Sequence, residues 1–300
     1  MGAPPVILVL ALSPSLDVTY EVSSLAVNGI TRPASVTRVA GGKALNMARV
    51  AAALGSEVHA VVPLGGHTGA WIDEMLAGDG VTADIVPSAA PTRTCVAIVE
   101  DGDAPESTDV YERAAPVSAQ EWRGIRSAVE LALERHRPAY LVLSGSIPDG
   151  VVVEELVELL LEARRMAARV VIDGSGAGLR ACVVAADLIK INRSEAAELL
   201  GVETAALPDG TTACRELRAR YAVDSVVTDG IRGAAASSVE FTGTVAAPRR
   251  RGRFSAGSGD AFLGGLVAAL DRGLGWADTL SAAADAAERN ALVPGQGRLA

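Results

Sequence analysis

The sequence predicts an α/β protein with a mainly parallel central sheet, helices on both of its faces, and a small second sheet beside it. Short continuous runs of Val, Ile and Leu alternate with longer segments of helical periodicity, a pattern typical of a parallel sheet buried on both faces. Segments 19–39 and 92–111 carry β-branched residues and turn signals but no helical periodicity. The 300 residues, 49% hydrophobic and 21% charged, suffice for a globular core.

Six short apolar runs predict the strands of the central sheet. In chain order they are 6–12, 58–63, 140–143, 170–173, 188–191 and 225–228. Between them lie stretches such as GVVVEELVELLLEARRMAA, in which apolar residues recur at helical spacing among Glu and Arg. Ligands of such sheets bind at the carboxyl ends of the strands. Several turns rich in Gly, Ser and Asn follow the strands directly, so these turns are the candidate ligand-binding segments.

Composition and charge argue against several classes of protein. A net charge of −9 opposes a nucleic-acid partner, whose phosphates need a basic surface. No segment offers the ~20 uninterrupted apolar residues of a membrane helix, and the apolar N-terminal run lacks the basic region of a signal peptide. Cys95, Cys182 and Cys214 are scattered without metal-ligand spacing, which predicts a reducing, cytoplasmic location rather than a disulfide framework.

The stretch AGSGDAFLGGLVAAL predicts a helix whose N-terminus can bind an anion. Gly257, Ser258 and Gly259 are small, so their backbone N–H groups would lie unpaired and accessible where the helix begins. The next residue, Asp260, could accept a proton from a hydroxyl that attacks a bound phosphate. The alternative is that Asp260 only complements the helix dipole.

A second turn, AGGKALNMARVAAALG, enters a helix that ends near Gly55, a plausible C′ glycine. Lys43 beside exposed amides could hold an anion, and Asn46 could bond to substrate hydroxyls. The alternative for Lys43 is a surface lysine on a capped helix.

A third turn, KINRSEAAELLG, carries Asn192 and, three residues later, Glu195. This spacing is typical of a capping box. The functional alternative is that Glu195 orders a magnesium ion through water, because Mg²⁺ prefers carboxylate and water ligands.

Three further stretches allow two interpretations each. VLSGSIPDG, which includes Ser144, is a strand followed by either a routine loop or a ligand turn. VVTDGIRGAAA either leaves room for a flat ligand or forms a hairpin. The run of arginines from Arg249 to Arg253 favours a solvated edge strand over a nucleic-acid patch, because the total charge is negative. No G-x-G-x-x-G follows the first strand, so a dinucleotide-binding site is not predicted.

Taken in order, these turns resemble the PfkB (ribokinase-like) carbohydrate kinase family. The resemblance rests on GGKALNMARVAAALG, SGSIPDG, KINRSE, TDGIRGA and AGSGDAFLGG, and it extends from residue 6 to about residue 297. The stretches SPSLDVTY, PLGGHTG, PTRT and DGSGAGLR are similar to the branch of phosphofructokinases and tagatose-6-phosphate kinases, whose sugars already carry a phosphate.

The resemblance implies a ribokinase-like three-layer fold in a single kinase domain, residues 1–300, with a discontinuous β lid from about 13–39 and 92–113. It also implies ATP as donor, Mg²⁺ as cofactor and a homodimer formed through the lid.

The resemblance further implies a role for each matching residue. Asp260 would be the catalytic base, and Gly257, Ser258 and Gly259 the anion hole for the γ-phosphate. The sugar-contacting positions would be Asp17, Gly42, Lys43, Asn46 and Ser144, with Arg93 reaching the phosphate that the substrate already carries. The nucleotide and magnesium positions would be Lys190, Asn192, Glu195, Thr228, Gly230, Gly233 and, near the adenine, Asn290.

The chain departs from the family pattern at several positions. Ala44 replaces a usual glycine, and Tyr111 stands in the altered segment 109–116 where the branch carries Asn, although Glu112 follows it. AERNAL replaces a run of small residues before Asn290.

The function expected is therefore ATP-dependent phosphorylation of a phosphorylated ketohexose, with fructose 1-phosphate favoured and fructose 6-phosphate or tagatose 6-phosphate next. The alternatives are a kinase of an unphosphorylated sugar or nucleoside and a non-catalytic regulator that binds sugar phosphates.

Overall fold

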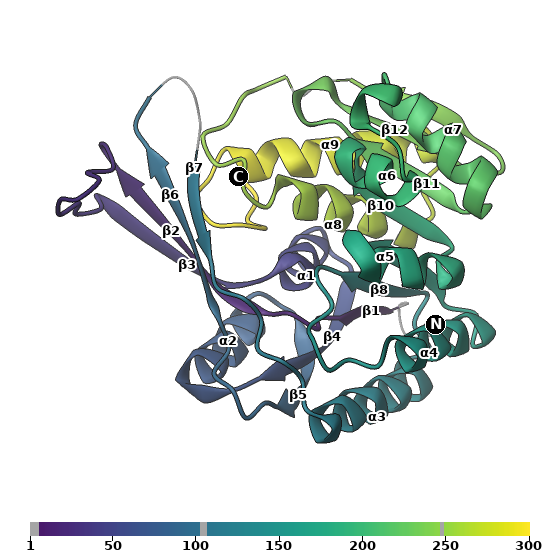
Figure 1. Cartoon of the computed structure of the whole chain (residues 1–300), viewed down its shortest axis with the longest axis horizontal. Helices are drawn as coiled ribbons and strands as arrows, with labels where there is room; N and C mark the ends of the chain where they lie inside the picture. The colour runs from purple at the N-terminus through teal and green to yellow at the C-terminus, as the bar shows by residue number, and fades with distance from the viewer. Residues whose placement is uncertain (1–5, 103–106, 247–248) are drawn as a thin grey trace.

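The large sheet runs through the middle of the molecule, with helices on both sides (Figure 1). The computed structural model describes residues 6–102, 107–246 and 249–300. In that part of the chain the large sheet has nine strands in the order β13-β12-β11-β10-β9-β8-β1-β4-β5. The pairs from β11 through to β5 are parallel, and β12 and β13 are antiparallel to their neighbours. This architecture confirms the predicted fold class.

All six predicted strands are present in the large sheet. They are β1 (Val6–Leu10), β4 (Glu57–Leu64), β8 (Tyr140–Ser144), β9 (Arg169–Asp173), β10 (Leu188–Asn192) and β11 (Asp224–Thr228). Three strands at the two edges of the sheet were not predicted: β5 (Thr82–Pro87), β12 (Ala234–Ser237) and β13 (Thr242–Val245). Edge strands lack the continuous apolar run that burial on both faces imposes on central strands, so they carry a weaker signal.

The helices form two layers. One face of the sheet is covered by α1 (Lys43–Ala53), α2 (Gly66–Gly78), α8 (Ser258–Asp271) and α9 (Trp276–Ala291). The other is covered by α3 (Ala119–His136), α4 (Val153–Arg165), α5 (Gly176–Cys182), α6 (Arg193–Leu200) and α7 (Gly210–Tyr221). Three short 3₁₀ turns complete the described helices: η1 (Val183–Ala185), η2 (Thr204–Ala206) and η3 (Gly230–Arg232). No helix within the described ranges is both long and apolar enough to cross a membrane.

Alternation along the strands divides the core between the two layers. Ile7 and Val9 of β1 pack with α1, α2, α8 and α9, whereas Leu8 and Leu10 pack on the opposite side. Successive side chains of a strand point to opposite faces, so an unbroken apolar run serves both cores. All four of these residues are fully buried.

A separate four-stranded sheet, which we call the lid, projects from one end of the molecule (Figure 1). Its strands are β2 (Ser15–Val22), β3 (Ser35–Gly41), β6 (Thr94–Glu100) and β7 (Ser107–Tyr111), in the order β3-β2-β6-β7. The two segments predicted to form a small sheet therefore pair with each other, through the parallel contact of β2 with β6.

The prediction of an edge strand for the arginine run was wrong. The strand before it, β13, ends at Val245, and residues 249–253 form an irregular connection to α8. The Arg250 guanidinium donates to Glu288 at 2.8 Å, and that of Arg253 to Asp101 at 2.8 Å. Carboxylates of α9 and of the lid therefore hold these two arginines. The segment is fixed by side-chain ion pairs and not by the backbone hydrogen bonds of a strand.

Candidate active site

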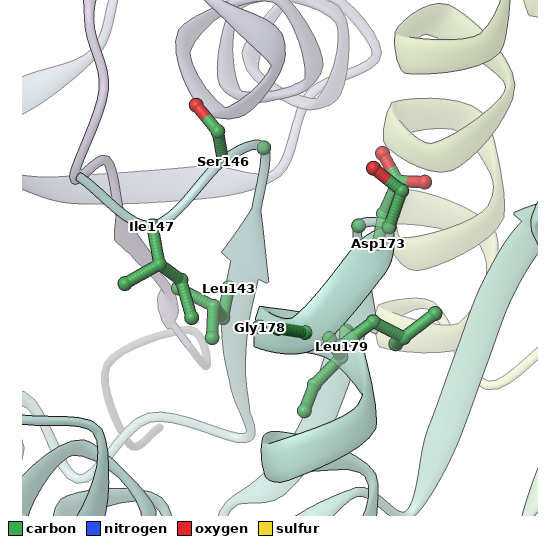
Figure 2. Close-up of a pocket in the computed structure, with 11 residues that line it drawn as sticks. Leu143, Ser146, Ile147, Asp173, Gly178 and Leu179 are labelled. Carbon is green, nitrogen blue, oxygen red and sulfur yellow. The ribbon is translucent and has the colours of Figure 1, made fainter. Parts of the chain in front are cut away.

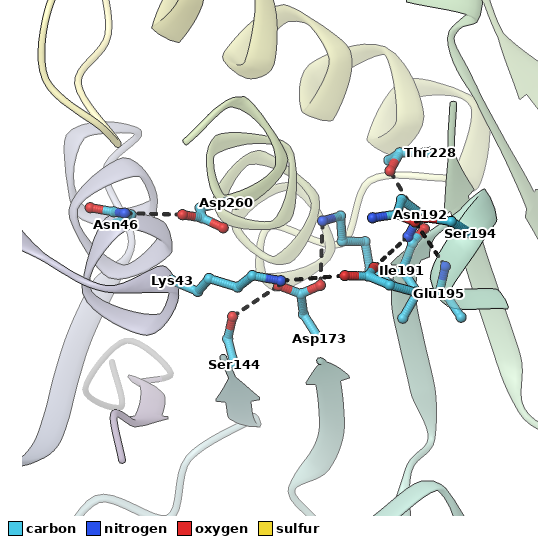
Figure 3. Close-up of polar contacts among 11 residues, drawn as sticks. Lys43, Asn46, Ser144, Asp173, Ile191, Asn192, Ser194, Glu195, Thr228 and Asp260 are labelled. Atoms are coloured by element: carbon cyan, nitrogen blue, oxygen red, sulfur yellow. Dashed lines mark hydrogen bonds and ion pairs between the residues drawn. The ribbon is translucent and has the colours of Figure 1, made fainter. Parts of the chain in front are cut away.

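Polar residues end four neighbouring parallel strands at one edge of the large sheet. Ser144 ends β8, Asp173 ends β9, Asn192 ends β10 and Thr228 ends β11. Helices α1 and α8 begin beside the same edge, so side chains far apart in the sequence lie together there (Figure 3). This is the position at which open α/β sheets bind ligands.

Helix α8 begins with backbone donors that have no acceptor. Its N-cap, Gly257, has φ 80°, a left-handed conformation that glycine adopts without strain. Within the described residues, the N–H groups of Gly257, Gly259 and Asp260 donate to no protein acceptor. The N–H of Ser258 donates to the Ser255 carbonyl at 3.1 Å, so the expectation of an unpaired amide was wrong for this residue. Asp260 thus replaces Ser258 among the open donors, because the chain makes a tight turn from Ser255 into the helix.

Asp260 is a buried carboxylate directly behind these donors. It is 7% exposed and accepts a hydrogen bond from Asn46 Nδ2 at 3.0 Å. Burial, followed by the nearby charge of Asp173, raises the pKa of Asp260 to about 7, although Lys43 and Asn46 oppose the rise. A group with this pKa can accept and release a proton near neutral pH.

Close packing of two helices places Asn46 beside Asp260. A Cβ at Gly264 of α8 would lie 2.6 Å from Cβ of Val50 of α1, so only glycine permits this approach. The glycine therefore brings α1 near enough to α8 for the contact between Asn46 and Asp260 to form.

Asp173 lies at the centre of the charged groups. It is 1% exposed; Oδ1 lies 3.4 Å from Lys190 Nζ, and Oδ2 lies 3.9 Å from Lys43 Nζ and accepts from Ser144 Oγ at 3.0 Å. Burial alone would raise its pKa, but the two lysines and Ser144 outweigh burial and hold the pKa of Asp173 below its usual range. The same carboxylate, with Glu195, raises the pKa of Lys43 despite desolvation. Asp173 and Lys43 are therefore charged at neutral pH.

Glu195 uses its two carboxylate oxygens differently. Oε2 accepts from the backbone N–H of Asn192 at 2.8 Å, while the Asn192 side chain accepts from the Glu195 N–H at 2.9 Å. This confirms the predicted capping box. Oε1 lies 3.6 Å from Lys43 Nζ and faces the other charged groups (Figure 3). Capping thus leaves one oxygen available to a ligand.

The donor set fits a magnesium ion that is held mainly by water and phosphate. Within the described ranges, no three His, Cys, Asp or Glu side chains gather closely enough to hold a metal by themselves. Both oxygens of Asp173 are engaged by lysines and Ser144, whereas Oε1 of Glu195 has only Lys43 nearby. Mg²⁺ typically keeps several waters and takes one or two protein carboxylates beside substrate phosphates, so Glu195 is the residue that would hold it.

Asp17 lies on the lid side of the same site. Its Oδ1 accepts from Ser15 Oγ at 2.6 Å, and its Oδ2 accepts from the Gly42 N–H at 3.2 Å and from Asn46 Nδ2 at 3.3 Å. A Cβ at residue 41 would lie 2.0 Å from Cγ of Asp17. Residue 41 must therefore be glycine for β3 to lie this close to the carboxylate. Burial raises the pKa of Asp17, and the three hydrogen bonds oppose it.

Arg93 is pinned at the base of the lid by backbone carbonyls. Its Nη1 donates to Glu112 O at 2.8 Å, Nη2 to Ser13 O at 3.1 Å, and Nε to Pro14 O at 3.3 Å. The side chain of Glu112 caps the lid strand instead, accepting from the Thr94 N–H at 2.8 Å. The fold therefore positions the guanidinium, and among the residues that the structure describes no carboxylate forms an ion pair with it.

Ser144, Lys190, Thr228, Gly230 and Gly233 are the other predicted residues at the carboxyl ends of the strands. Ser144 is buried and bonds to Asp173, and Lys190 is buried beside Gly259. Thr228 and Gly233 flank the turn between the antiparallel strands β11 and β12, so this stretch does form a hairpin, one of the two alternatives left open for it. Gly230, between them, has open space where a Cβ would lie.

Asn290 is fully buried under the turn that leads into α8. Its Nδ2 donates to Ala256 O at 3.1 Å, to Phe254 O at 3.4 Å and to Ser258 Oγ at 3.3 Å, and its Oδ1 accepts from the Gly297 N–H at 2.7 Å. These bonds hold the shape of the turn. A contact of Asn290 with adenine remains a prediction.

A cavity of about 260 Å³ opens between the loop after β8 and the start of α5 (Figure 2). Leu143, Ile147 and Leu179 form its apolar side, and Asp173 lies at its edge. A Cβ at Gly178 would lie 2.8 Å from Ile147. The glycine therefore allows the Ile147 side chain to pack against the start of α5. Typical ligand pockets measure about 300–1,000 Å³, so this cavity by itself is too small for a nucleotide and a sugar phosphate together.

Sequence reasoning missed three residues of the site. Asp173 carried a usable signal, because it is a carboxylate at the end of a buried strand and precedes a Gly-Ser-Gly turn. Arg49 also carried one, as a charged residue that is followed and preceded by apolar residues in α1. Gln296, whose Oε1 accepts from Asn46 Nδ2 at 3.3 Å, carried none that we can identify.

Comparisons with known proteins identify the family and support the fold. The family model described as pfkB family carbohydrate kinase matches residues 10–298. The tetrameric inhibited form of phosphofructokinase-2 from Escherichia coli is 26% identical, with a TM-score of 0.85 over 96% of this chain and 94% of that chain. Phosphofructokinase-2 from Escherichia coli in complex with fructose-6-phosphate is 27% identical, with a TM-score of 0.82 over 95% and 93%. A candidate 1-phosphofructokinase from Thermotoga maritima shares the fold at 22% identity, with a TM-score of 0.83 over 95% and 92%.

Proposed function

The chain belongs to the pfkB family of carbohydrate kinases, and we propose that it transfers the γ-phosphate of ATP to a hydroxyl of a phosphorylated ketohexose. Fructose 1-phosphate is the favoured acceptor, followed by fructose 6-phosphate and tagatose 6-phosphate. The single observation that carries the proposal is the position of Asp260. It is a buried carboxylate with a pKa of about 7, directly behind the open backbone donors of α8.

Asp260 acts as the base in this proposal. Its ionised carboxylate takes the proton of the attacking hydroxyl, while the oxygen of that hydroxyl forms the new bond to phosphorus and ADP leaves. Asn46 holds the carboxylate by the 3.0 Å bond to Nδ2. The N–H groups of Gly257, Gly259 and Asp260 stabilise the negative oxygens of the transferred phosphoryl group, since they are fixed before the reaction.

The charged groups at the strand ends bind the polyphosphate. Lys43, predicted as a sugar-contacting residue, pairs with Asp173 and Glu195 at the strand ends, so in this proposal it supplies positive charge beside Asp173 together with Lys190. Oε1 of Glu195 would hold a Mg²⁺ ion through water, and the ion would supply charge neutralisation for the phosphates. Thr228, Gly230 and Gly233 belong to the proposed nucleotide site beside the β11–β12 hairpin, where Gly230 leaves open space and Gly233 packs closely against the Val245 carbonyl.

The lid side of the site supports a substrate that already carries a phosphate. Asp17 and Asn46 offer groups that bond to sugar hydroxyls, and Arg93 holds an uncompensated guanidinium at the base of the lid. Guanidinium groups bind phosphate through paired hydrogen bonds. The relative from Escherichia coli whose structure contains fructose-6-phosphate is consistent with this substrate class.

We also propose a homodimer formed through the lid. Val27, Ile30 and Val110 of the lid are 80%, 79% and 60% exposed. Pairing two lids would remove this apolar surface from water. For location, we propose the cytoplasm, since Cys95, Cys182 and Cys214 are all buried and unpaired.

The test is ADP release over a panel of sugar phosphates, free sugars and nucleosides. We expect turnover with phosphorylated ketohexoses and much weaker turnover with the other compounds. Preference for a free sugar or a nucleoside would refute the phosphosugar assignment. Binding of a sugar phosphate without ADP release would identify a regulator instead.

A further inference from the structure

Arg49 is a buried arginine that the proposed chemistry does not use directly. It lies on α1 one turn after Asn46 and is 6% exposed. Its Nε pairs with Asp79 at 2.7 Å, Nη1 donates to Gln296 O at 2.7 Å, and Nη2 donates to Ala40 O. A buried arginine is costly to desolvate unless its donors are satisfied. Here they are satisfied by α2, the C-terminal loop and the end of β3.

One further bond of Arg49 points into the site. Its Nη1 also donates to Oδ1 of Asn46 at 3.3 Å. The Nδ2 of Asn46 contacts three acceptors on the opposite side: Asp260 at 3.0 Å, Asp17 at 3.3 Å and Gln296 Oε1 at 3.3 Å. Both ends of the Asn46 amide therefore form hydrogen bonds. Oδ1 accepts from Arg49, and Nδ2 faces the acceptors of the active site.

The chemistry of the guanidinium allows only this orientation of the amide. A guanidinium carries donors and no acceptor, so the Asn46 atom facing Arg49 must be oxygen. If the amide were reversed, its NH₂ would face the donors of Arg49, and its oxygen would face the carboxylates of Asp17 and Asp260. Both contacts would be repulsive.

We propose that Arg49 is a positioning residue that fixes the amide orientation of Asn46, so that Nδ2 is held on the carboxylate of Asp260. This inference rests on the proposed role of Asp260 as base. Without Arg49, only the contacts of Nδ2 with its acceptors hold the amide in this orientation, so Nδ2 is placed less firmly and Asp260 loses part of the hydrogen bond that favours its ionised form. The base then requires a higher pH to ionise.

The test compares Arg49→Met with the wild type in the dependence of kcat on pH. We expect the acidic limb to move upward by about one pH unit, which is about tenfold lower turnover on that limb. Titration of the Asp260 carboxyl carbon by ¹³C NMR, assigned by its loss in Asp260→Asn, should show the same shift without substrate. An unchanged limb and an unchanged titration would overturn the proposal.

Two controls separate positioning from charge and from stability. In an Asn46→Ala background the amide is gone, so Arg49→Met should no longer move the Asp260 titration; an equal shift there would reduce Arg49 to a nearby charge. Asp79→Asn weakens the ion pair of Arg49 but leaves the bond to Asn46. It should lower the melting temperature without moving the titration, and a shift as large as that of Arg49→Met would overturn the proposal.

Failure of the proposed function is distinguishable from failure of this inference. If the wild type releases no ADP with any compound of the panel, the function is refuted. The NMR titration still decides whether Arg49 controls Asn46.

Discussion

The carboxylate of Asp260 and the side-chain amide of Asn46 lie 3.0 Å apart, although 214 positions separate them in the chain. Asp260 begins α8 and Asn46 lies on α1, so the packing of these two helices creates the contact. It joins the predicted base to the residues of the sugar side, because the same Nδ2 also reaches Asp17. The predictions below test the groups around this contact.

Replacing Asp260 by Asn should lower kcat by roughly 10²–10⁴, the usual contribution of a positioned base, and leave ATP affinity nearly unchanged. The amide cannot accept the proton, but it is similar in shape to the carboxylate. Steady-state kinetics and ATP titration measure the two effects. Asp271→Asn, at the other end of α8, is the matched control and should turn over normally. Near wild-type turnover of Asp260→Asn would remove this residue from the mechanism.

The turnover rate should fall on the acidic side of about pH 7, because only ionised Asp260 accepts a proton. The groups facing it are Lys43 and Asn46 of α1, Asp173 of β9 and Lys190 of β10. The raised pKa also predicts the sign of a stability effect. An ionised Asp260 destabilises the fold fully above pH 7 and progressively less as pH falls towards the ordinary value of 3.8.

Asp260→Asn should therefore melt higher than the wild type at pH 8, and this advantage should shrink between pH 7 and pH 4. Thermal melts across this range measure it. A constant difference between the two proteins at all pH values would contradict the raised pKa.

Replacing Glu195 by Gln should raise the magnesium concentration needed for half-maximal activity and leave the melting temperature nearly unchanged. Glutamine also serves at this position of a capping box, whereas a neutral amide holds a hydrated cation less well. Glu121→Gln is a matched control, because Glu121 completes the capping box of α3. It should not alter the response to magnesium. If Glu195→Gln lowers the melting temperature and leaves that response unaltered, the residue only caps α6.

Replacing Arg93 by Ala should raise KM for the sugar phosphate strongly and leave KM for ATP almost unchanged. Loss of one charge-assisted contact costs about 2–3 kcal/mol, or roughly 30- to 150-fold in affinity. The comparison is steady-state kinetics with each substrate varied in turn. Because Arg93 also bonds to Ser13, Pro14 and Glu112, a purely structural role would change both KM values together. A parallel change in both KM values would refute a contact between Arg93 and the phosphate of the sugar. An equal KM for the sugar phosphate in the wild type and the variant would refute it too.

Local patterns in the sequence predicted the central strands, the capping box of Asn192 and Glu195, and the glycine turn before Asp260. These features depend on side-chain periodicity and on bonds between residues a few positions apart, so they can be read from short stretches. The strands β5 and β13 were missed because they are only partly buried, and β12 was missed because it is a run of four small residues without Val, Ile or Leu. The Ser258 amide was misjudged because its acceptor depends on how the chain turns at Ser255.

The sequence by itself determined the fold class, the order of the motifs and the residue types offered at the strand ends. Only the tertiary structure decided which of these residues meet. The meeting of Asp17, Asn46 and Asp260 depends on strand order and on the close packing of α1 against Gly264. The charge of Asp173 and the orientation of Asn46 depend in turn on partners from other elements, Lys190 and Arg49. Burial and distance control these energies, and both are set by the whole fold rather than by neighbours in the chain.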